Sequence, residues 1–291
     1  MFMPRKILEE KLKQLLAEDV GQGDVTTATI VPTGLAAQAK VVAKEAGTVA
    51  GVEETTILAE SLGLNVTAAL KDGEEVRPSQ VIMKISGNAR TILSAERTML
   101  NLLSRMSGIA TTTRRLTEKL EKAHSTAKIA ATRKTAPGLL YFDKKAVLVG
   151  GGDPHRLHLD DMVLIKDNHI AMVGSVEEAV KKAKANVSFS KKIEVEVTRV
   201  QDALKAAEAG ADVIMLDNLS PKQINETVAS LKKARFYGKI LLEASGGITA
   251  ENLLEYASTQ VDLISMGELT HSVKALDISL EITANKDKVR N

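Results

Sequence analysis

From Lys128 onward the sequence alternates short apolar runs with amphipathic segments, and no other feature restricts the fold as strongly. The runs start at intervals of about 20–35 residues, a spacing typical of strand–helix units. There are six of them: KIAATRKT, MVLIKDN, KIEVEVT, DVIMLDN, ILLEASGG and DLISMGE. Most gaps show helical spacing, with Gly210 as a stop signal for one helix and Pro221 near the start of the next. Strands this apolar predict a parallel sheet that is buried on both faces.

Polar side chains and glycines stand where these runs end. They are Arg133 and Lys134, Lys166 and Asp167, Glu196, Asp217, Ser245 with Gly246 and Gly247, and Gly267. In a (β/α) barrel the carboxyl ends of the strands converge on one mouth, where active sites lie. A doubly wound sheet spreads them along a line instead. The pattern therefore favours a barrel with a functional site at its mouth.

The first part of the chain has a different pattern. Residues 4–17 carry apolar side chains at helical spacing, and residues 35–85 contain short β-rich segments with one helix near residues 53–62. Residues 91–123 predict one or two long helices, interrupted or bent around Ser107 and Gly108. We therefore expect an α/β chain with two unequal domains, joined between about residues 105 and 120.

Composition excludes several classes of function. The 291 residues include no cysteine, which rules out disulfides, thiolate metal sites and cysteine nucleophiles. Basic and acidic residues number 39 and 37, so the net charge of +2 gives no overall field for binding nucleic acid. Only 2% of the residues are aromatic, which argues against a site built on stacking. The start, MFMPRKILEEKLKQLL, resembles neither a signal peptide nor a membrane span, and we expect a soluble cytoplasmic protein.

Glycine-rich segments are candidates for phosphate binding. Ser245, Gly246 and Gly247 follow a predicted strand and precede a helix, so their backbone N–H groups can surround a phosphate. Met266 and Gly267 follow the next predicted strand, and the glycine there allows a ligand to approach the backbone closely. Phosphate sites of barrels often use the last two such loops. A plain turn explains either segment alone, but the two together favour phosphate. A third segment lacks the GxxxxGK[ST] pattern, and both a turn and a direct role stay open for Gly150, Gly151 and Gly152.

Charged side chains point to an anionic ligand. The basic residues expected near the mouth are Arg97, Arg133, Lys134, His155, Arg156 and Lys166. Arg97 and Arg156, taken singly, are also compatible with solvated helix charges, whereas the residues that end apolar strands are not. Glu194 and Glu196 alternate on one strand face, with Asp217 expected beside them. These acids either neutralise nearby lysines or bind ribose hydroxyls or Mg²⁺. The histidines show no zinc-ligand pattern.

These motifs, in this order and spacing, resemble those of the quinolinate phosphoribosyltransferases, also called carboxylating nicotinate-nucleotide pyrophosphorylases. The resemblance covers almost the whole chain and rests on EDVGQGDVTT, ERTMLNLLSRMSGIAT, TRKTAPGL, GGGDPHRLHLDDMVLIKDNH, EVEV, MLDN, EASGG and ISMGELTHSVKALDISL. It implies an N-terminal α/β sandwich plus an incomplete parallel (β/α) barrel. The expected domains are residues 1–112 and 113–273, with a C-terminal tail, 274–291, that returns to the first domain.

The resemblance also implies an activity. Members transfer the phosphoribosyl group of 5-phosphoribosyl 1-pyrophosphate to quinolinate with decarboxylation, which gives nicotinate mononucleotide, pyrophosphate and carbon dioxide in NAD biosynthesis. They use Mg²⁺ and form homodimers or larger homo-oligomers, in which an Arg of the neighbouring subunit completes each site. Arg97 matches that residue. No nucleic acid or membrane partner is expected.

Site residues follow by matching each motif. The quinolinate-binding groups match Arg133, His155 and Arg156, with Thr132 beside them. The catalytic lysines between the two substrates match Lys134 and Lys166. Glu196 and Asp217 match the catalytic acids on the ribose and magnesium side, which hold the metal directly or through water. The 5-phosphate loops match Ser245, Gly246, Gly247, Ser265, Met266 and Gly267. Two positions depart from the family pattern: Leu140 replaces the Arg of PGLR, and Lys145 replaces a common Tyr.

Three alternatives stay open at the level of sequence. The first is a phosphoribosyltransferase of the same fold that acts on nicotinate or another acceptor, such as a molybdate-associated paralogue. The second is a Schiff-base lyase that uses Lys166 as its nucleophile. The third is a non-catalytic ligand-binding protein. The basic groups that match the quinolinate site favour an acceptor with two carboxylates.

Overall fold

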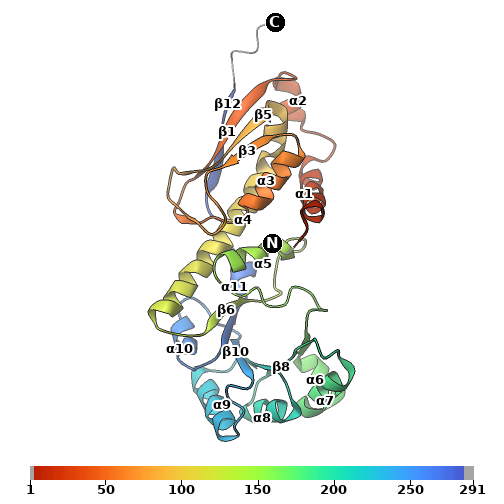
Figure 1. Cartoon of the computed structure of the whole chain (residues 1–291), viewed down its shortest axis with the longest axis vertical. Helices are drawn as coiled ribbons and strands as arrows, with labels where there is room; N and C mark the ends of the chain where they lie inside the picture. The colour runs from red at the N-terminus through yellow and green to blue at the C-terminus, as the bar shows by residue number, and fades with distance from the viewer. Residues whose placement is uncertain (1–2, 285–291) are drawn as a thin grey trace. The chain divides into compact units, whose positions relative to one another are not determined.

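The computed structural model describes residues 3–284 and consists of two compact units (Figure 1). The first contains the chain up to Thr112, the segment Tyr141–Gly150 and the chain from Val273 on. The second contains Thr113–Leu140 and Gly151–Ser272. Residues 285–291 of the expected tail, and residues 1–2, lie outside the described range. The segment Tyr141–Gly150 groups with the first unit, although it falls inside the range 113–273 expected for the barrel domain.

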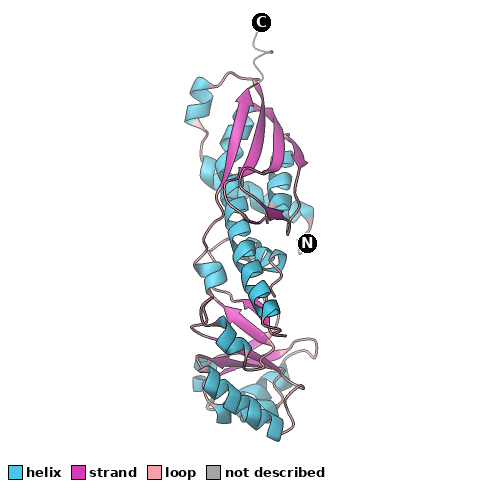
Figure 2. Ribbon diagram, turned by 90° about the vertical axis from the view of Figure 1, so that its left-hand side faces the viewer, coloured by secondary structure: helices cyan, strands magenta, loops and turns pink. Residues whose placement is uncertain are grey.

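The first unit is built on a four-stranded antiparallel sheet (Figure 2). Its strands are, in spatial order, β12 (Ile278–Ala284), β1 (Ala36–Ala43), β5 (Val81–Asn88) and β3 (Asn65–Ala68). Ala37, Ala39 and Val41 of β1 are buried, whereas Gln38 and Lys40 between them are exposed, as the period of two requires. Two short strands, β2 (Gly47–Thr48) and β4 (Glu75–Val76), pair separately. The β-rich layer predicted for residues 35–85 is confirmed.

Helices of the first unit are α1 (Arg5–Val20), α2 (Val25–Ile30), α3 (Val52–Ser61), α5 (Leu140–Val149) and the first part of α4 (Ala89–Lys122). α4 is a single helix of 34 residues, so the interruption predicted around Ser107 and Gly108 does not occur. A Cβ atom at Gly108 would clash with the backbone of Lys274 and Ala275. The glycine therefore allows the C-terminal segment to pass against the helix, and it does not end the helix.

The second unit contains all six strands that the apolar runs predicted. They are β6 (Lys128–Ala131), β7 (Val163–Ile165), β8 (Ile193–Val197), β9 (Val213–Asp217), β10 (Leu241–Ser245) and β11 (Leu263–Met266). All are parallel, in the spatial order β6-β11-β10-β9-β8-β7. The helices between these strands are α6 (Asp167–Val173), α7 (Val176–Asn186), α8 (Val200–Ala209), α9 (Pro221–Lys233) and α10 (Leu253–Ala257), and α11 (Glu268–His271) follows β11.

The parallel sheet is the expected incomplete barrel, because β6 and β7 are its two edge strands within residues 3–284. Asp153 extends the edge at β6 through a parallel bridge to Ala130. Local signals fix the helices between the strands. Gly210 ends α8 in the left-handed conformation with φ 94°, and the Ser220 hydroxyl accepts the N–H of Gln223 at the start of α9.

The triple glycine forms a turn. α5 ends at Val149, and the N–H of Gly150 donates to the carbonyl of Ala146. Gly151 then takes φ 91°, a conformation that favours glycine. Of the two interpretations left open by the sequence, the structure supports the turn.

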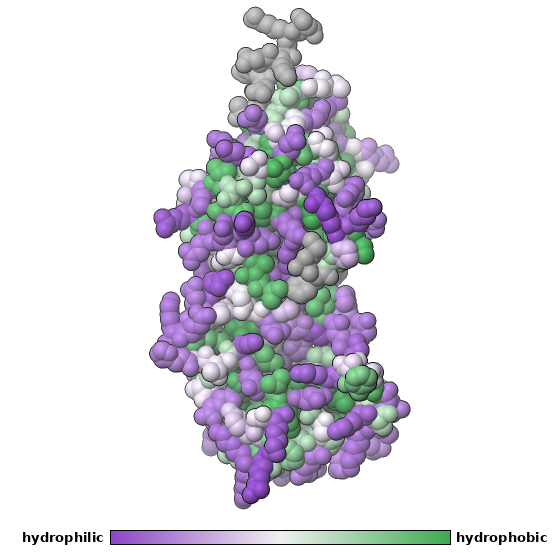
Figure 3. Space-filling view, viewed as in Figure 1, coloured by the Kyte–Doolittle hydropathy of each residue, from purple (hydrophilic) through white to green (hydrophobic). Residues whose placement is uncertain are grey.

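Polar residues are spread over the face drawn in Figure 3, with apolar patches between them. Within the described part of the chain, no helix combines the length and the apolar character needed to cross a membrane.

Candidate active site

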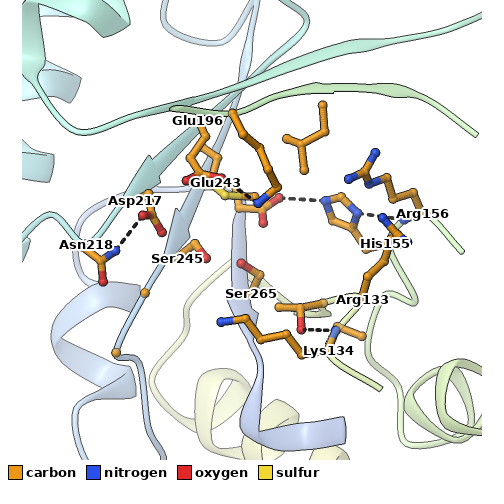
Figure 4. Close-up of a pocket in the computed structure, with 17 residues that line it drawn as sticks. Arg133, Lys134, His155, Arg156, Glu196, Asp217, Asn218, Glu243, Ser245 and Ser265 are labelled. Carbon is orange, nitrogen blue, oxygen red and sulfur yellow. Dashed lines mark hydrogen bonds and ion pairs between the residues drawn. The ribbon is translucent and has the colours of Figure 1, made fainter. Parts of the chain in front are cut away.

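A pocket of about 490 Å³ lies at the carboxyl ends of the parallel strands (Figure 4). Every strand of the second unit, or the loop after it, contributes to its wall, which is the convergence that the strand-end pattern predicted. The pocket brings together most of the predicted site residues: Thr132, Arg133, Lys134, His155, Arg156, Lys166, Glu196, Asp217, Ser245, Gly246, Gly247 and Ser265. Three predicted residues are not part of its lining: Arg97, Met266 and Gly267.

β8 determines how its acidic residues are placed. Glu194 and Glu196 alternate with buried Val195 and Val197, so the two carboxylates share one face of the strand. Glu196 lines the pocket and accepts a hydrogen bond from the Lys166 ammonium at 3.0 Å. Glu194, two residues earlier, is completely buried.

Cationic groups lie along the loops after β6 and β7 and in the segment after the glycine turn. Lys166 directly follows β7, and its backbone N–H donates to Nδ1 of His169, which fixes the start of α6. Burial, and then the positive charge of Arg133, lower the pKa of Arg156. The two guanidinium groups therefore repel each other, and an anion between them relieves this repulsion.

The loop after β10 is a tight turn that two glycines make possible. Gly246 and Gly247 take φ 92° and 62°, conformations that favour glycine. A Cβ atom at Gly246 would lie 2.8 Å from the backbone nitrogen of Asn218, so only glycine fits there. The Asn218 N–H donates to the Ser245 carbonyl at 2.8 Å and holds this loop against the end of β9. The backbone is thus kept close to the pocket in a fixed shape.

Met266 and Gly267 lie behind the pocket wall. Met266 is 1% exposed, and a Cβ atom at Gly267 would lie 2.9 Å from the His271 ring and 3.4 Å from Cδ of Lys134. The Thr270 hydroxyl donates to the carbonyl of Lys134 at 2.9 Å. This loop therefore supports the Lys134 segment, and only Ser265 of the predicted second phosphate loop reaches the pocket surface.

Asp217 and Glu196 form an acidic side of the pocket. Burial, and then the negative charge of Glu196, raise the pKa of Asp217, while the side chain of Asn218 donates to its carboxylate at 2.6 Å and opposes the shift. A carboxylate under this influence is stabilised by a cation. Two carboxylates that offer oxygen donors fit Mg²⁺, which prefers oxygen ligands.

The structure also adds residues that the sequence did not single out. Glu243 lies in the middle of β10, lines the pocket and approaches His155, and Asn218 supports the glycine loop. A signal for Glu243 was present, because a lone charge in the apolar strand LLEAS, two residues before Ser245, shares the face of that serine. Asn218 follows the strand end at Asp217 and takes φ 54°, which Asn tolerates better than most residues.

Arg97 lies outside this pocket, on α4 in the first unit, where its side chain is exposed.

Sequence comparisons cover nearly the whole chain. Residues 24–107 match the profile "Quinolinate phosphoribosyl transferase, N-terminal domain", and residues 109–281 match "Quinolinate phosphoribosyl transferase, C-terminal domain". The chain is 49% identical over 275 residues to the probable nicotinate-nucleotide pyrophosphorylase (carboxylating) of Methanocaldococcus jannaschii, which covers 93% of this chain and 95% of the relative. It is 39% identical over 286 residues to the human nicotinate-nucleotide pyrophosphorylase (carboxylating), which covers 98% of this chain and 95% of the relative.

A solved structure agrees with these matches. The nicotinate-nucleotide pyrophosphorylase from Francisella tularensis superposes with a TM-score of 0.87 at 36% identity, and the match covers 97% of this chain and 98% of that one. Both units of the chain therefore have counterparts in the same relatives.

Proposed function

Because the chain belongs to the quinolinate phosphoribosyltransferase family, we propose that it transfers the phosphoribosyl group of 5-phosphoribosyl 1-pyrophosphate to quinolinate. The products are nicotinate mononucleotide, pyrophosphate and carbon dioxide, a step of NAD biosynthesis. One observation carries this proposal: basic side chains and three carboxylates line a single pocket beside a glycine loop. The charged members of this set are Arg133, Lys134, His155, Arg156, Lys166, Glu196, Asp217 and Glu243.

The acceptor end is assigned to the Arg133 and Arg156 side. Quinolinate carries two carboxylates, and guanidinium groups bind carboxylates in a bidentate manner. Mutual repulsion between Arg133 and Arg156 favours a doubly charged acceptor over a neutral one. We place Thr132 and His155 at the same end, where both line the pocket.

The donor end is assigned to the loops after β10 and β11. Backbone N–H groups of Gly246 and Gly247 and the side chains of Ser245 and Ser265 bind the 5-phosphate. We keep Met266 and Gly267 in the phosphate site as supporting residues, which shape the second loop from behind the pocket wall.

The chemistry follows from bringing the ring nitrogen of quinolinate to C1 of the donor. A bond forms between these atoms while the bond from C1 to the pyrophosphate oxygen breaks, and C1 gains oxocarbenium character. Lys134 and Lys166 offset the repulsion between the acceptor carboxylates and the pyrophosphate. Glu196 and Asp217 hold the ribose and stabilise the positive charge at C1. Carbon dioxide then leaves, and the electron pair that stays on the ring carbon is stabilised by the neighbouring cations and takes a proton.

Glu196 and Asp217 are also the residues that would hold Mg²⁺, directly or through water. The raised pKa of Asp217 and the all-oxygen donor set fit this ion. When bound, it neutralises negative charge on the pyrophosphate leaving group.

We further propose that the protein works as a homodimer or larger homo-oligomer. Arg97 is exposed, lies in a different unit from the pocket and has the position in ERTML expected for a residue that completes a neighbour's site. A neighbouring copy supplies this arginine to the acceptor end.

The direct test incubates the purified chain with quinolinate, 5-phosphoribosyl 1-pyrophosphate and Mg²⁺. Nicotinate mononucleotide and carbon dioxide should form in equal amounts, and chelation of Mg²⁺ should stop both. Product from nicotinate but not from quinolinate would transfer the assignment to another phosphoribosyltransferase of this fold. Trapping of a carbonyl substrate by borohydride at Lys166 would favour a lyase, and tight quinolinate binding without turnover would favour a binding protein. Cell fractionation tests the expected cytoplasmic location.

A further inference from the structure

A buried acid pair lies behind His155 (Figure 4 draws one member, Glu243, with the histidine). Glu194 of β8 and Glu243 of β10 are both 0% exposed. Their Oε2 atoms lie 3.4 and 3.2 Å from Nε2 of His155, respectively. Among the described residues, Oε1 of Glu243 and both carboxylate oxygens of Glu194 have no hydrogen-bond partner, so Glu243 is hydrogen-bonded to the imidazole and Glu194 approaches it as an ion-pair contact. Two carboxylates this deeply buried are costly unless a positive group compensates them, and the imidazole is the group that both approach.

We propose that Glu243 and Glu194 are positioning residues for the reaction: Glu243 accepts the Nε2–H of His155 and Glu194 adds a second negative charge beside it, so that together they fix the orientation of the ring and favour its positively charged form. The inference rests on the proposed function, because a charged His155 serves an anionic acceptor. Neither glutamate needs to touch the substrate.

Contacts on the other side of the ring determine where its first proton lies. The backbone N–H of Arg156 donates to Nδ1 at 2.7 Å, so the neutral ring carries its proton on Nε2, toward the two acids. When a second proton binds Nδ1, this nitrogen no longer accepts the Arg156 N–H. The new Nδ1–H is then available to donate to a carboxylate of quinolinate. Nδ1 is thus the nitrogen whose protonation changes, while Glu243 keeps the proton on Nε2 in place.

The backbone at this position is also fixed. His155 takes φ 54°, and its own N–H donates to Oδ1 of Asp153 at 2.7 Å. The side chain is 12% exposed. Only a small part of the ring therefore meets solvent, and its orientation is set by Asp153, the Arg156 N–H and the acid pair together.

The charges around His155 explain why two acids are needed. Burial lowers the pKa of His155, but the close contacts and negative charges of Glu194 and Glu243 outweigh it and raise the pKa to about 9. Arg133, Arg156 and Lys166 line the same pocket and oppose a further positive charge. Without the acid pair, burial and these cations would leave the ring neutral near pH 7.

The same three side chains place ligand atoms within 4.8 Å of one another, a spacing that also suits a metal ion. A metal ion can bind Nε2 only if this nitrogen carries no proton. The Arg156 N–H instead favours the tautomer with its proton on Nε2. In our proposal the three side chains therefore share a proton and do not bind a metal ion.

The first experiment follows the ring carbons of histidine by NMR as pH is varied, with no substrate present. Loss of one signal in His155→Gln assigns it. We expect a midpoint of about 9 in the wild type and midpoints nearer the ordinary 6.5 in Glu194→Gln and Glu243→Gln. Glu208→Gln, at an exposed position of α8, is the matched control and should leave the midpoint unchanged. A wild-type midpoint at or below 6.5 would overturn the inference without any variant, and so would unchanged midpoints in folded Gln variants.

The second experiment measures kcat/KM for quinolinate against pH. Because the charged ring is the active form, kcat/KM should fall as pH rises through the pKa of His155, and Glu243→Gln should move this fall to lower pH. In a His155→Gln background, Glu243→Gln should cause no further shift. Loss of activity at all pH values with an unmoved profile would indicate a purely structural role and would overturn the proposal.

These experiments separate the inference from the function on which it rests. Absence of quinolinate turnover together with a raised His155 midpoint would reject the proposed function alone. Turnover together with an ordinary midpoint would reject the inference alone.

Discussion

The ammonium group of Lys166 donates a hydrogen bond to Oε2 of Glu196 at 3.0 Å and so joins the carboxyl ends of β7 and β8. The lysine side chain is 47% exposed and the glutamate side chain is 14% exposed. An ion pair this open to solvent stabilises a fold by only about 0–1 kcal/mol. The pair therefore contributes little to stability, and both of its members are available to substrates.

Replacement of Lys166 by methionine should reduce activity far more than stability. We expect kcat/KM to fall about 10²–10³-fold, the usual loss for one electrostatic group that acts in the transition state. The free energy of unfolding should change by less than about 1 kcal/mol. Steady-state kinetics and urea denaturation measure the two quantities. Lys182→Met is the control, because Lys182 is also exposed and lies at the same distance, 3.0 Å, from its partner Glu178. Equal losses of activity in both variants would contradict the assignment.

Alanine at Gly246 should damage the phosphate loop. The residue has φ 92°, and a Cβ atom there would lie 2.6 Å from Cγ of Asn218. We expect KM for 5-phosphoribosyl 1-pyrophosphate to rise at least about 10-fold, because the loop must move away from the phosphate. Gly238→Ala is the control, because Gly238 also has a positive φ, 78°, but an added Cβ there would have no atom within 4 Å. It therefore shows the effect of backbone strain without a clash. The interpretation fails if the two variants show the same KM.

Replacement of Lys145 by methionine should destabilise the first unit. Its ammonium lies 2.5 Å from Glu53, 2.7 Å from Glu54 and 3.5 Å from Asp72. Burial raises the pKa of Glu54, and Lys145 opposes that shift. Removal of the lysine leaves a buried acid uncompensated, which costs about 3–5 kcal/mol. Chemical denaturation measures the loss, with Lys6→Met at an exposed position of α1 as control. If the free energy of unfolding falls no more than in the control, Lys145 is not needed to compensate the buried acids.

Complementation tests whether Arg97 serves a neighbouring copy. Arg97→Ala and Lys134→Ala should each be inactive alone, because each removes one group from every site. Mixed under conditions of subunit exchange, they should regain activity, since some heterodimers contain one site with both residues intact. Tagged subunits prove that heterodimers form. Continued inactivity of proven heterodimers would mean that Arg97 and Lys134 act within one chain or in separate steps.

Local patterns explain why much of the second unit could be predicted. Strand periodicity placed Glu194 and Glu196 on one face, and strand ends placed Lys166, Asp217 and the Gly246 loop at one mouth. Each of these inferences needs only a few consecutive residues and the rule that parallel strands share a direction.

Features that depend on distant partners could not be predicted. Glu243 becomes important through His155, which lies 88 positions earlier in the sequence. Likewise, buried Asp143 and Lys145 of α5 look like ordinary helix charges until Arg105 and Glu54 are found beside them. Gly108 resembles a helix breaker, and its role appears only when the backbone at Lys274 is known.

β12 has a consequence for the order in which the protein is made. It pairs with β1 from Ile278 opposite Ala43 to Ala284 opposite Ala37, although β1 is translated almost at the start. Until residues 278–284 leave the ribosome, β1 exposes unpaired backbone groups, the kind of edge that recruits other chains. The second unit ends at Ser272, so it does not depend on these last residues. A released chain truncated before β12 would therefore contain all the residues of the pocket together with an unfinished, aggregation-prone sheet.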